Sequence, residues 1–269
     1  KVKKISNLNN QNFKRDLAIL DVPLKFKNPF NVPDKVKSKY ILRCFNVALD
    51  LVKKKKVSGL INCAINKKET FGKNYTGITE FLAKKEGVLG KEAMLIYNKK
   101  LSVSPITTHI KVKKISKKIS KKIIVNKITT INKFFSNTLR FRPKIGLLGL
   151  NPHNDELRKN SEEKKIIIPA VKQLKKRKIF IKGPLPSDTV FMNLKNEKFD
   201  VVVGMYHDQV LSPFKAIYKF NAINVTLGLP YIRVSPDHGT GVNIVKKNIA
   251  NPESLLETIK FFKNINVRT

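Results

Sequence analysis

Short apolar runs alternate with amphipathic stretches along most of the chain. Apolar residues at helical spacing predict helices at residues 13–20, 34–56, 111–135 and 253–262, another starting at Thr79, and one over 162–178 that Pro169 can break. Segments of strand length that are rich in apolar residues lie at residues 57–63, 93–97, 101–108, 145–150, 201–205 and 222–227, and each is a strand candidate. Strands that alternate with helices favour an α/β fold on a largely parallel sheet with crossover helices.

The length and composition narrow the class of protein. A chain of 269 residues with 41% hydrophobic and 28% charged residues is long enough to bury a sizeable core, which excludes a wholly disordered chain. Only two cysteines are present, Cys44 and Cys63, so a disulfide scaffold or a cysteine-rich zinc module is excluded. No apolar run is long enough to span a membrane. We therefore expect a protein of the reducing cytoplasm.

The net charge of +36 first suggests a polyanionic partner. The chain has 47 Lys but only eight Arg, however, and arginine is the preferred residue for bidentate contacts to phosphates and bases. The lysine excess accompanies abundant Asn and Ile, and all three residues have AT-rich codons. A compositional bias therefore explains the charge better than specific nucleic-acid binding, and we expect no specific nucleic-acid partner and no membrane partner.

Three of the four histidines follow strand-like apolar runs. His109 ends SVSPITTH, His153 ends IGLLGLNPH and His207 ends VVVGMYH. Ligands of open α/β sheets collect outside the carboxyl ends of the strands, so these imidazoles can converge there. A three-histidine site with an open position is typical of a catalytic metal centre. Asp208 follows His207 directly and can orient it.

Two further segments carry candidate anion-binding groups. Arg233 lies in the apolar segment LGLPYIRVSPDHGTG, where a partly buried guanidinium needs a carboxylate or a phosphate as its partner. The glycine-containing run at 237–241 precedes a possible helix, where backbone N–H groups can meet phosphates. Neither GxGxxG nor GxxxxGK[ST] is present, so the sequence predicts neither a Rossmann fingerprint nor a P-loop.

Eight segments together resemble the 4-hydroxythreonine-4-phosphate dehydrogenase family of pyridoxal phosphate biosynthesis: GLINCAINKK, YTGITEF, ITTHI, GLLGLNPHNDE, IKGPLPSDTVF, VVVGMYHDQVLSPFK, AINVTLGLPYIRVSPDHGTG and NIANPES. The resemblance covers residues from about 57 to 256 and implies an isocitrate/isopropylmalate dehydrogenase-like fold, with two α/β lobes and an active-site cleft between them. We expect one lobe from residues 1–75 and 240–269, and a second from 76–239 that carries most metal and substrate residues.

The resemblance also implies a reaction: NAD- or NADP-dependent oxidation of 4-phosphohydroxy-L-threonine, followed by decarboxylation to 3-amino-2-oxopropyl phosphate. It implies a homodimer that binds a small phosphorylated hydroxy-amino acid and a divalent metal, with Zn, Mg and Co all open. The implied metal ligands are His109, His153 and His207, and the implied substrate contacts are Thr79, Lys215, Asn224 and Arg233. The implied cofactor-binding residues are His238, Gly239 and Thr240. Asp208 and Lys215 are candidates for the catalytic acid–base group.

Two departures from the family pattern keep alternatives open. Many family members have a substrate-contacting histidine where this chain has Ile78, and isoleucine can neither bind a phosphate by hydrogen bonds nor transfer a proton. The family's N-terminal strand and its Gly-Pro-rich loop are absent, so we expect that the N-terminal segment is lacking. The alternatives are a related dehydrogenase for another phosphorylated hydroxy acid, or a non-catalytic relative that binds a phosphorylated ligand.

Overall fold

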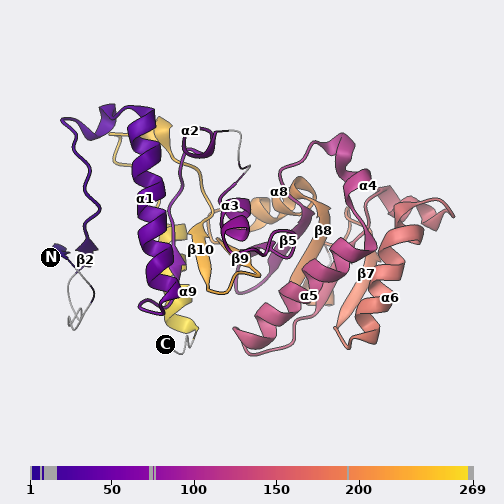
Figure 1. Cartoon of the computed structure of the whole chain (residues 1–269). Helices are drawn as coiled ribbons and strands as arrows, with labels where there is room; N and C mark the ends of the chain where they lie inside the picture. The colour runs from indigo at the N-terminus through magenta and orange to yellow at the C-terminus, as the bar shows by residue number, and fades with distance from the viewer. Residues whose placement is uncertain are drawn as a thin grey trace.

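The computed structural model describes residues 2–6, 8, 17–72, 75, 77–192 and 194–265 (Figure 1). Its α-helices are α1 (Asp34–Lys53), α2 (Lys67–Phe71), α3 (Ile78–Lys85), α4 (Ile115–Lys118), α5 (Lys121–Asn137), α6 (Ile168–Lys176), α7 (Leu194–Glu197), α8 (His207–Tyr218) and α9 (Glu253–Asn264). Its strands are β1 (Val2–Ile5), β2 (Leu17–Leu20), β3 (Leu60–Ile61), β4 (Ala93–Tyr97), β5 (Ser102–Thr107), β6 (Ile145–Leu148), β7 (Ile181–Leu185), β8 (Val201–Tyr206), β9 (Ile223–Leu227) and β10 (Arg233–Pro236). Short 3₁₀ turns are η1 (Pro29–Asn31), η2 (Val112–Lys114), η3 (Pro152–Leu157) and η5 (Val242–Ile244), and a π-helical turn, η4 (Glu163–Ile167), leads into α6.

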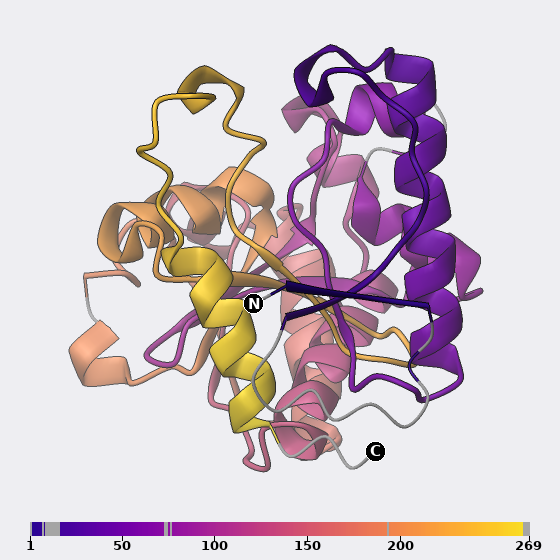
Figure 2. The same cartoon turned by 90° about the vertical axis from the view of Figure 1, so that its left-hand side faces the viewer.

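Eight of the described strands form one mixed sheet in the order β3-β10-β9-β4-β5-β8-β6-β7. The strands from β5 to β7 are parallel and β3 is parallel to β10, whereas the pairs β10-β9, β9-β4 and β4-β5 are antiparallel. The prediction of a largely parallel sheet is therefore correct for β5 to β7 and for the β3-β10 pair, and wrong for the strands between them. Strands β1 and β2 pair in parallel as a separate two-stranded sheet, which Figure 2 shows beside α1.

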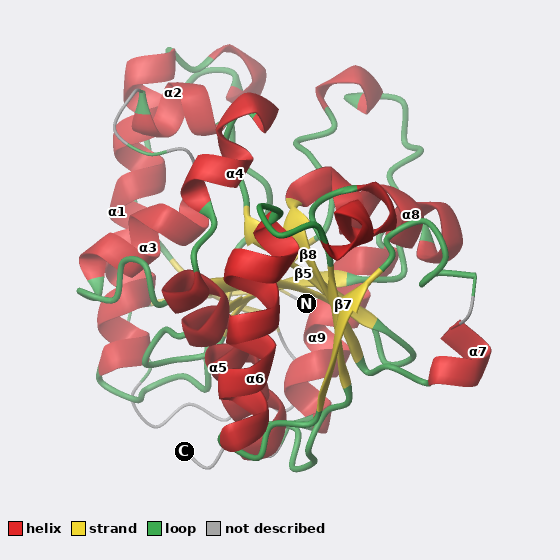
Figure 3. Ribbon diagram, turned by 90° about the vertical axis from the view of Figure 1, so that its right-hand side faces the viewer, coloured by secondary structure: helices red, strands yellow, loops and turns green. Residues whose placement is uncertain are grey.

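Helices cover both faces of the large sheet because the side chains of each central strand alternate between two cores. In β8, Val201 and Val203 pack into a core with α5, α6 and α9, whereas Val202 packs on the other face with α8. Figure 3 shows α5 and α6 in front of the sheet. A third core joins α1, α2 and α3 around Phe45 and Phe81. Residues of α3 and α8 line a common cavity, where the site described below lies.

Most predicted elements are present, and one is wrong. The predicted helix at residues 13–20 is a strand over Leu17–Leu20, and residues 13–16 lie outside the described part of the chain. The apolar run LAIL pairs with β1 and so satisfies its backbone groups in a ladder instead of a helix. The amphipathic region at 111–135 divides at Ser120, whose side chain accepts the backbone N–H of Ile123 and starts α5. Pro169 lies in the first turn of α6, just where the π-helical turn ends.

The large sheet runs through both of the lobes expected from the resemblance. Strand β3, expected in the first lobe, pairs with β10 of the second lobe, and α9 packs against β9 and β10. The lobe boundaries at residues 75 and 239 stay a prediction. Among the helices that the structure describes, none is long and apolar enough to cross a membrane.

Candidate active site

Two of the predicted metal-binding histidines meet because of the sheet register. Strands β5 and β8 are parallel neighbours, and Thr107 pairs with Tyr206 at their carboxyl ends. His109 and His207 follow these paired residues within two positions, so their rings lie side by side with centroids 6.2 Å apart. The two imidazoles therefore lie together beyond the carboxyl ends of neighbouring parallel strands, the region where ligands of open α/β sheets collect.

A carboxylate contacts each of these imidazoles at Nδ1. Asp208 Oδ1 lies 2.7 Å from Nδ1 of His207, and Glu80 Oε1 lies 3.3 Å from Nδ1 of His109. An imidazole that donates Nδ1–H to a carboxylate keeps the Nε2 lone pair for a metal ion. The donor chemistry of His109 and His207 therefore fits a borderline divalent metal.

Glu80 holds His109 from the first turn of α3. Burial raises the pKa of the Glu80 carboxyl, but hydrogen bonds from His109 and Thr108 outweigh this and leave the pKa below its ordinary value. The approach of Glu80 depends on Gly77, because a Cβ there would lie 2.6 Å from Glu80 Oε2 and 3.3 Å from the His109 ring. Glu80 was not among the predicted site residues, although it belongs to the YTGITEF segment.

His153 does not join the other two histidines in this chain. It lies five residues beyond the end of β6, on an exposed turn where His153 to Leu157 all have left-handed backbone angles. Among the described residues, no group of three His, Cys, Asp or Glu side chains is close enough to hold a metal ion. The expected convergence of three imidazoles is therefore not seen among the described residues of one chain.

The loop that carries His153 is nonetheless tightly fixed. Glu163 is fully buried in the π-helical turn before α6, and its Oε1 accepts the backbone N–H groups of Leu150 and Asn151 at 2.8 and 2.9 Å. Gln209 links β6 to β8, since its amide donates to the Gly149 carbonyl and accepts from the Met205 N–H. The buried Glu163 carboxylate therefore stabilises the conformation of the turn through these hydrogen bonds.

A cavity of about 320 Å³ opens in front of His109 and His207. Of the predicted site residues, it is lined by Thr79, His109, His207, Lys215, Asn224, Arg233, His238 and Gly239. His153, Asp208 and Thr240 do not line it. Ile78 does, from the wall that α3 forms. The sequence missed other lining residues, notably Asn62, Lys67 and Asp237.

Arg233 forms the floor of this cavity. It is only 2% exposed, and its Nε and Nη1 donate to Asn62 Oδ1 and Thr226 Oγ1 at 2.7 and 2.9 Å. Among the described residues it has no carboxylate partner within ion-pair distance. Burial lowers the pKa of Arg233 to about 10, so the side chain stays cationic at neutral pH. A buried guanidinium with unused donors and no counter-ion is suited to an anionic ligand.

Lys215 supplies a second cation, paired with a partly buried acid. Its ammonium lies 3.1 Å from Asp237 Oδ2. Burial raises the pKa of the Asp237 carboxyl above its ordinary value, and Lys215 opposes this only in part. The backbone N–H of Asp237 donates to Ser254 Oγ, whose hydroxyl donates to the Ala222 carbonyl. These bonds fix Asp237 between β10 and α9, where it can hold Lys215 in place.

The fold and the cavity define a class: an α/β protein with paired imidazoles and two cations around an anion-sized site. The chain belongs to the family described as pyridoxal phosphate biosynthetic protein PdxA, whose profile matches residues 1–262.

Among known relatives, the chain is 45% identical over 214 residues to a 4-hydroxythreonine-4-phosphate dehydrogenase from Sulfurihydrogenibium sp., a match that covers 78% of this chain and 65% of that protein. It is 39% identical to the enzyme of the same name from Aquifex aeolicus, with 93% and 76% covered. The chain thus spans just under two thirds of the first relative and about three quarters of the second.

A crystal structure of 4-hydroxythreonine-4-phosphate dehydrogenase from Klebsiella pneumoniae superimposes with a TM-score of 0.83 at 31% identity, over 98% of this chain and 82% of that one. The prediction of an α/β fold of this family is confirmed.

Proposed function

We propose that this chain oxidises and decarboxylates 4-phosphohydroxy-L-threonine to 3-amino-2-oxopropyl phosphate, with NAD or NADP as the hydride acceptor. The observation that carries the proposal is Arg233, a buried cation without a carboxylate partner that lies on the floor of the cavity containing His109 and His207. The substrate is doubly anionic, with a phosphate at one end and a carboxylate at the other. One of its anionic groups would supply the counter-charge that Arg233 lacks. The other would give Lys215 a second acidic partner beside Asp237.

The proposed roles follow from position in the cavity. Arg233 and Lys215 bind the anionic ends of the substrate. Thr79 and Asn224, which line the same cavity, supply uncharged hydrogen-bonding groups beside them. Such fixation orients the reacting carbon toward the cofactor and removes much of the entropy cost of the reaction. We assign the dinucleotide to the loop with His238, Gly239 and Thr240, since the first two residues form one rim of the cavity.

The substrate hydroxyl releases its proton to water and the carbinol carbon transfers a hydride to NAD or NADP, which leaves a ketone. A divalent metal, held by His109 and His207, would lower the pKa of the hydroxyl and polarise the ketone. The ketone then allows the neighbouring carboxylate to leave as carbon dioxide, and the remaining carbon takes up one proton. Lys215, which lines the cavity as an ammonium, is the proposed donor of that proton. Asp208 is proposed to orient His207, because its carboxylate contacts that ring and lies outside the cavity.

The third metal ligand is proposed to be His153 from a second copy of the chain in a homodimer. This follows from its exposure and its separation from the other two imidazoles within one chain. In an equimolar mixture of His153→Ala and His207→Ala chains, each heterodimer has one site with all three histidines. Activity should therefore appear on mixing two inactive variants. Two inactive variants that stay inactive after denaturation and refolding together would exclude the shared site.

The activity itself is tested by following NADH or NADPH formation with 4-phosphohydroxy-L-threonine and added Zn²⁺, Mg²⁺ or Co²⁺. We expect turnover that a chelator and His207→Ala both abolish. Asp50→Asn is a control, because its ion pair with Lys54 is exposed and neither residue lines the cavity. Retained metal binding with no turnover would contradict the proposed reaction.

A second candidate is a related oxidation of another phosphorylated hydroxy acid. It rests on Ile78, which lines the cavity without a hydrogen-bonding group. An apolar wall favours a substrate that lacks a polar group at that position. Comparing kcat/KM for 4-phosphohydroxy-L-threonine with that for the corresponding phosphate without the amino group separates the two candidates. A preference for the second compound, reversed by Ile78→His, would favour this second reaction.

A further inference from the structure

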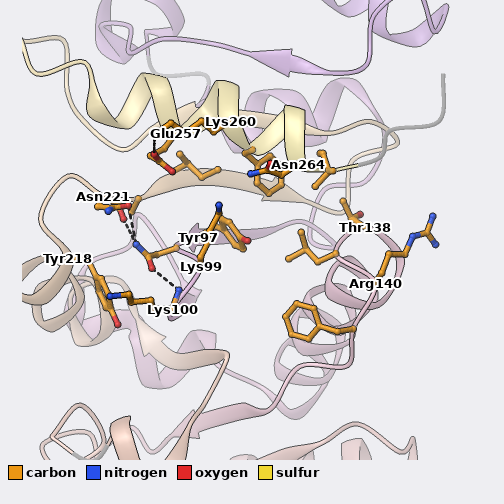
Figure 4. A pocket seen from close by; sticks show the side chains of 17 residues that line it. Tyr97, Lys99, Lys100, Thr138, Arg140, Tyr218, Asn221, Glu257, Lys260 and Asn264 are labelled. Carbon is orange, nitrogen blue, oxygen red and sulfur yellow. Dashed lines mark hydrogen bonds and ion pairs between the residues drawn. The ribbon is translucent and has the colours of Figure 1, made fainter.

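A second cavity, called the large cavity below, lies away from the histidines and has a volume of about 780 Å³ (Figure 4). It opens where β4 ends and β5 begins, between the carboxyl ends of α5 and α8 and the side of α9. His109, in contrast, follows the opposite end of β5. The two cavities also use opposite faces of β9, since Ile223 lines the large cavity and its neighbour Asn224 lines the histidine site. The large cavity is therefore separate from the proposed active site.

Aromatic side chains make up much of its wall. Tyr97, Phe141, Tyr218 and Phe261 all line it. Tyr97 packs edge-on against Phe261, with ring centroids 5.3 Å apart, and Figure 4 shows Tyr97 projecting below α9 with Tyr218 across the space from it. Neither tyrosine hydroxyl has a hydrogen-bond partner among the described residues. Burial raises the pKa of both phenols, so they remain donors at neutral pH. The wall therefore offers flat apolar surfaces together with free O–H groups.

The charge of the lining is strongly positive. Lys99, Lys100, Arg140 and Lys260 contribute cations, and the lining contains a single carboxylate, Glu257. That carboxylate pairs with Lys260 at 2.7 Å, which leaves the other three cations without an acidic partner in the lining. Asn98 fixes the turn that carries Lys99 and Lys100, because its side chain accepts the Lys100 N–H and donates to the Asn221 carbonyl. Two of these three cations, Lys99 and Lys100, thus lie on a turn that Asn98 holds in place beside the aromatic wall.

We propose that this cavity is a second ligand site, which binds a planar aromatic ring that carries a phosphate group. Rings of this kind match the aromatic wall, and the phosphate matches the three uncompensated cations. A volume of this size accommodates a mononucleotide or a phosphorylated pyridine. The inference does not depend on the proposed reaction, since no residue is shared by the two cavities.

Isothermal titration calorimetry with two probes tests the proposal. Pyridoxine 5′-phosphate represents phosphorylated pyridines without an aldehyde that would label lysines, and AMP represents mononucleotides. We expect one of the two to bind at one site per chain, and the tighter probe identifies the class of ring. Lys99→Glu with Lys100→Glu should weaken binding by about tenfold or more, since two charge-assisted contacts are replaced by repulsion.

Matched variants decide whether the binding belongs to this cavity. Lys117→Glu with Lys118→Glu makes the same charge change on two exposed lysines of α4, and it should change the dissociation constant less than about twofold. Phe141→Ala should weaken the ring-bearing probe but leave inorganic phosphate unaffected. Equal losses in both double variants, equal affinity for inorganic phosphate alone, or loss of binding in Arg233→Lys would each overturn the proposal. So would the failure of both probes to bind.

Discussion

Arg233→Met separates a ligand-binding role of the buried guanidinium from a structural one. Burial lowers the pKa of Arg233 to about 10. At about 1.4 kcal/mol per pKa unit, the charged side chain therefore costs the folded state about 3 kcal/mol. The hydrogen bonds to Asn62 and Thr226 return a similar amount, at about 1.5 kcal/mol each for a charged donor. Methionine removes both contributions and fills similar space, so the net change in unfolding free energy should be within about 1 kcal/mol.

Substrate binding should respond very differently. Arg233 is already desolvated in the free protein, so an anion that enters the cavity need not desolvate it. The electrostatic attraction between the anion and Arg233 therefore contributes directly to the binding free energy. Removal of one member of such a buried charge pair costs about 3 kcal/mol, which corresponds to about a 100-fold loss in kcat/KM. Arg233→Lys keeps the charge but loses the forked geometry of the guanidinium. Its kcat/KM should therefore lie between that of the wild type and that of Arg233→Met.

Urea denaturation and steady-state kinetics on the same samples measure both effects. Arg177→Met is the matched control, because Arg177 is exposed and, among the described residues, its guanidinium hydrogen-bonds only to Thr129; it should change neither quantity. Because the Arg233 side chain is charged in both the folded and the unfolded state below about pH 10, the difference between wild type and variant should not vary with pH in the neutral range. A loss of more than about 4 kcal/mol in stability with unchanged KM would refute the reasoning and make Arg233 a structural residue.

Three further outcomes are expected. Glu80→Gln should weaken Zn²⁺ binding about tenfold in a chelator competition, because the contact that orients His109 is lost; an unchanged affinity would contradict this role. Glu163→Gln should cost about 2 kcal/mol in urea unfolding, because the acceptor of the Leu150 and Asn151 N–H groups loses its charge and an amide nitrogen at the Oε2 position cannot accept the Asn151 side-chain N–H, whereas Glu162→Gln at a half-buried position should cost less. The carboxyl of Asp237 has a raised pKa in the fold, so its stabilising contribution is present at low pH and is lost as pH rises through that pKa. Asp237→Asn should therefore stabilise the protein at neutral pH and have little effect near pH 3, as thermal melting at the two pH values would show.

The sequence predicted the elements whose apolar runs are continuous and buried on both faces. Strands β4 and β6 are of this kind and lie inside their predicted ranges, and β8 extends one residue beyond its predicted range of 201–205. Strand β7 was missed because IKGPL contains glycine and proline, which weaken any strand pattern. Strand β3 is only two residues long within the predicted range 57–63, since it lies at the edge of the large sheet. Periodicity alone could not give the mixed direction of the sheet, because direction depends on which strands become neighbours.

The site was predictable where sequence position and strand register agree. His109 and His207 follow the paired ends of neighbouring strands by two residues or fewer, so the short connections leave little freedom. His153 follows β6 by five residues, and that loop takes a left-handed course that no simple pattern predicts. Glu80 and Asn62 are separated in sequence from the side chains that they hold, His109 and Arg233, and no local signal reports such contacts.

These long-range contacts share one physical feature that links the fold to the chemistry. The imidazole of His109, the guanidinium of Arg233 and the turn before His153 are each held by a polar group from a different element, namely Glu80, Asn62 and Glu163. A group that is already held in place pays little ordering entropy when a ligand binds. The sheet brings the reactive side chains to one edge, whereas these distant partners fix their direction. Substitutions at the holding residues should therefore impair metal or substrate binding even though Glu163 lines no part of the cavity.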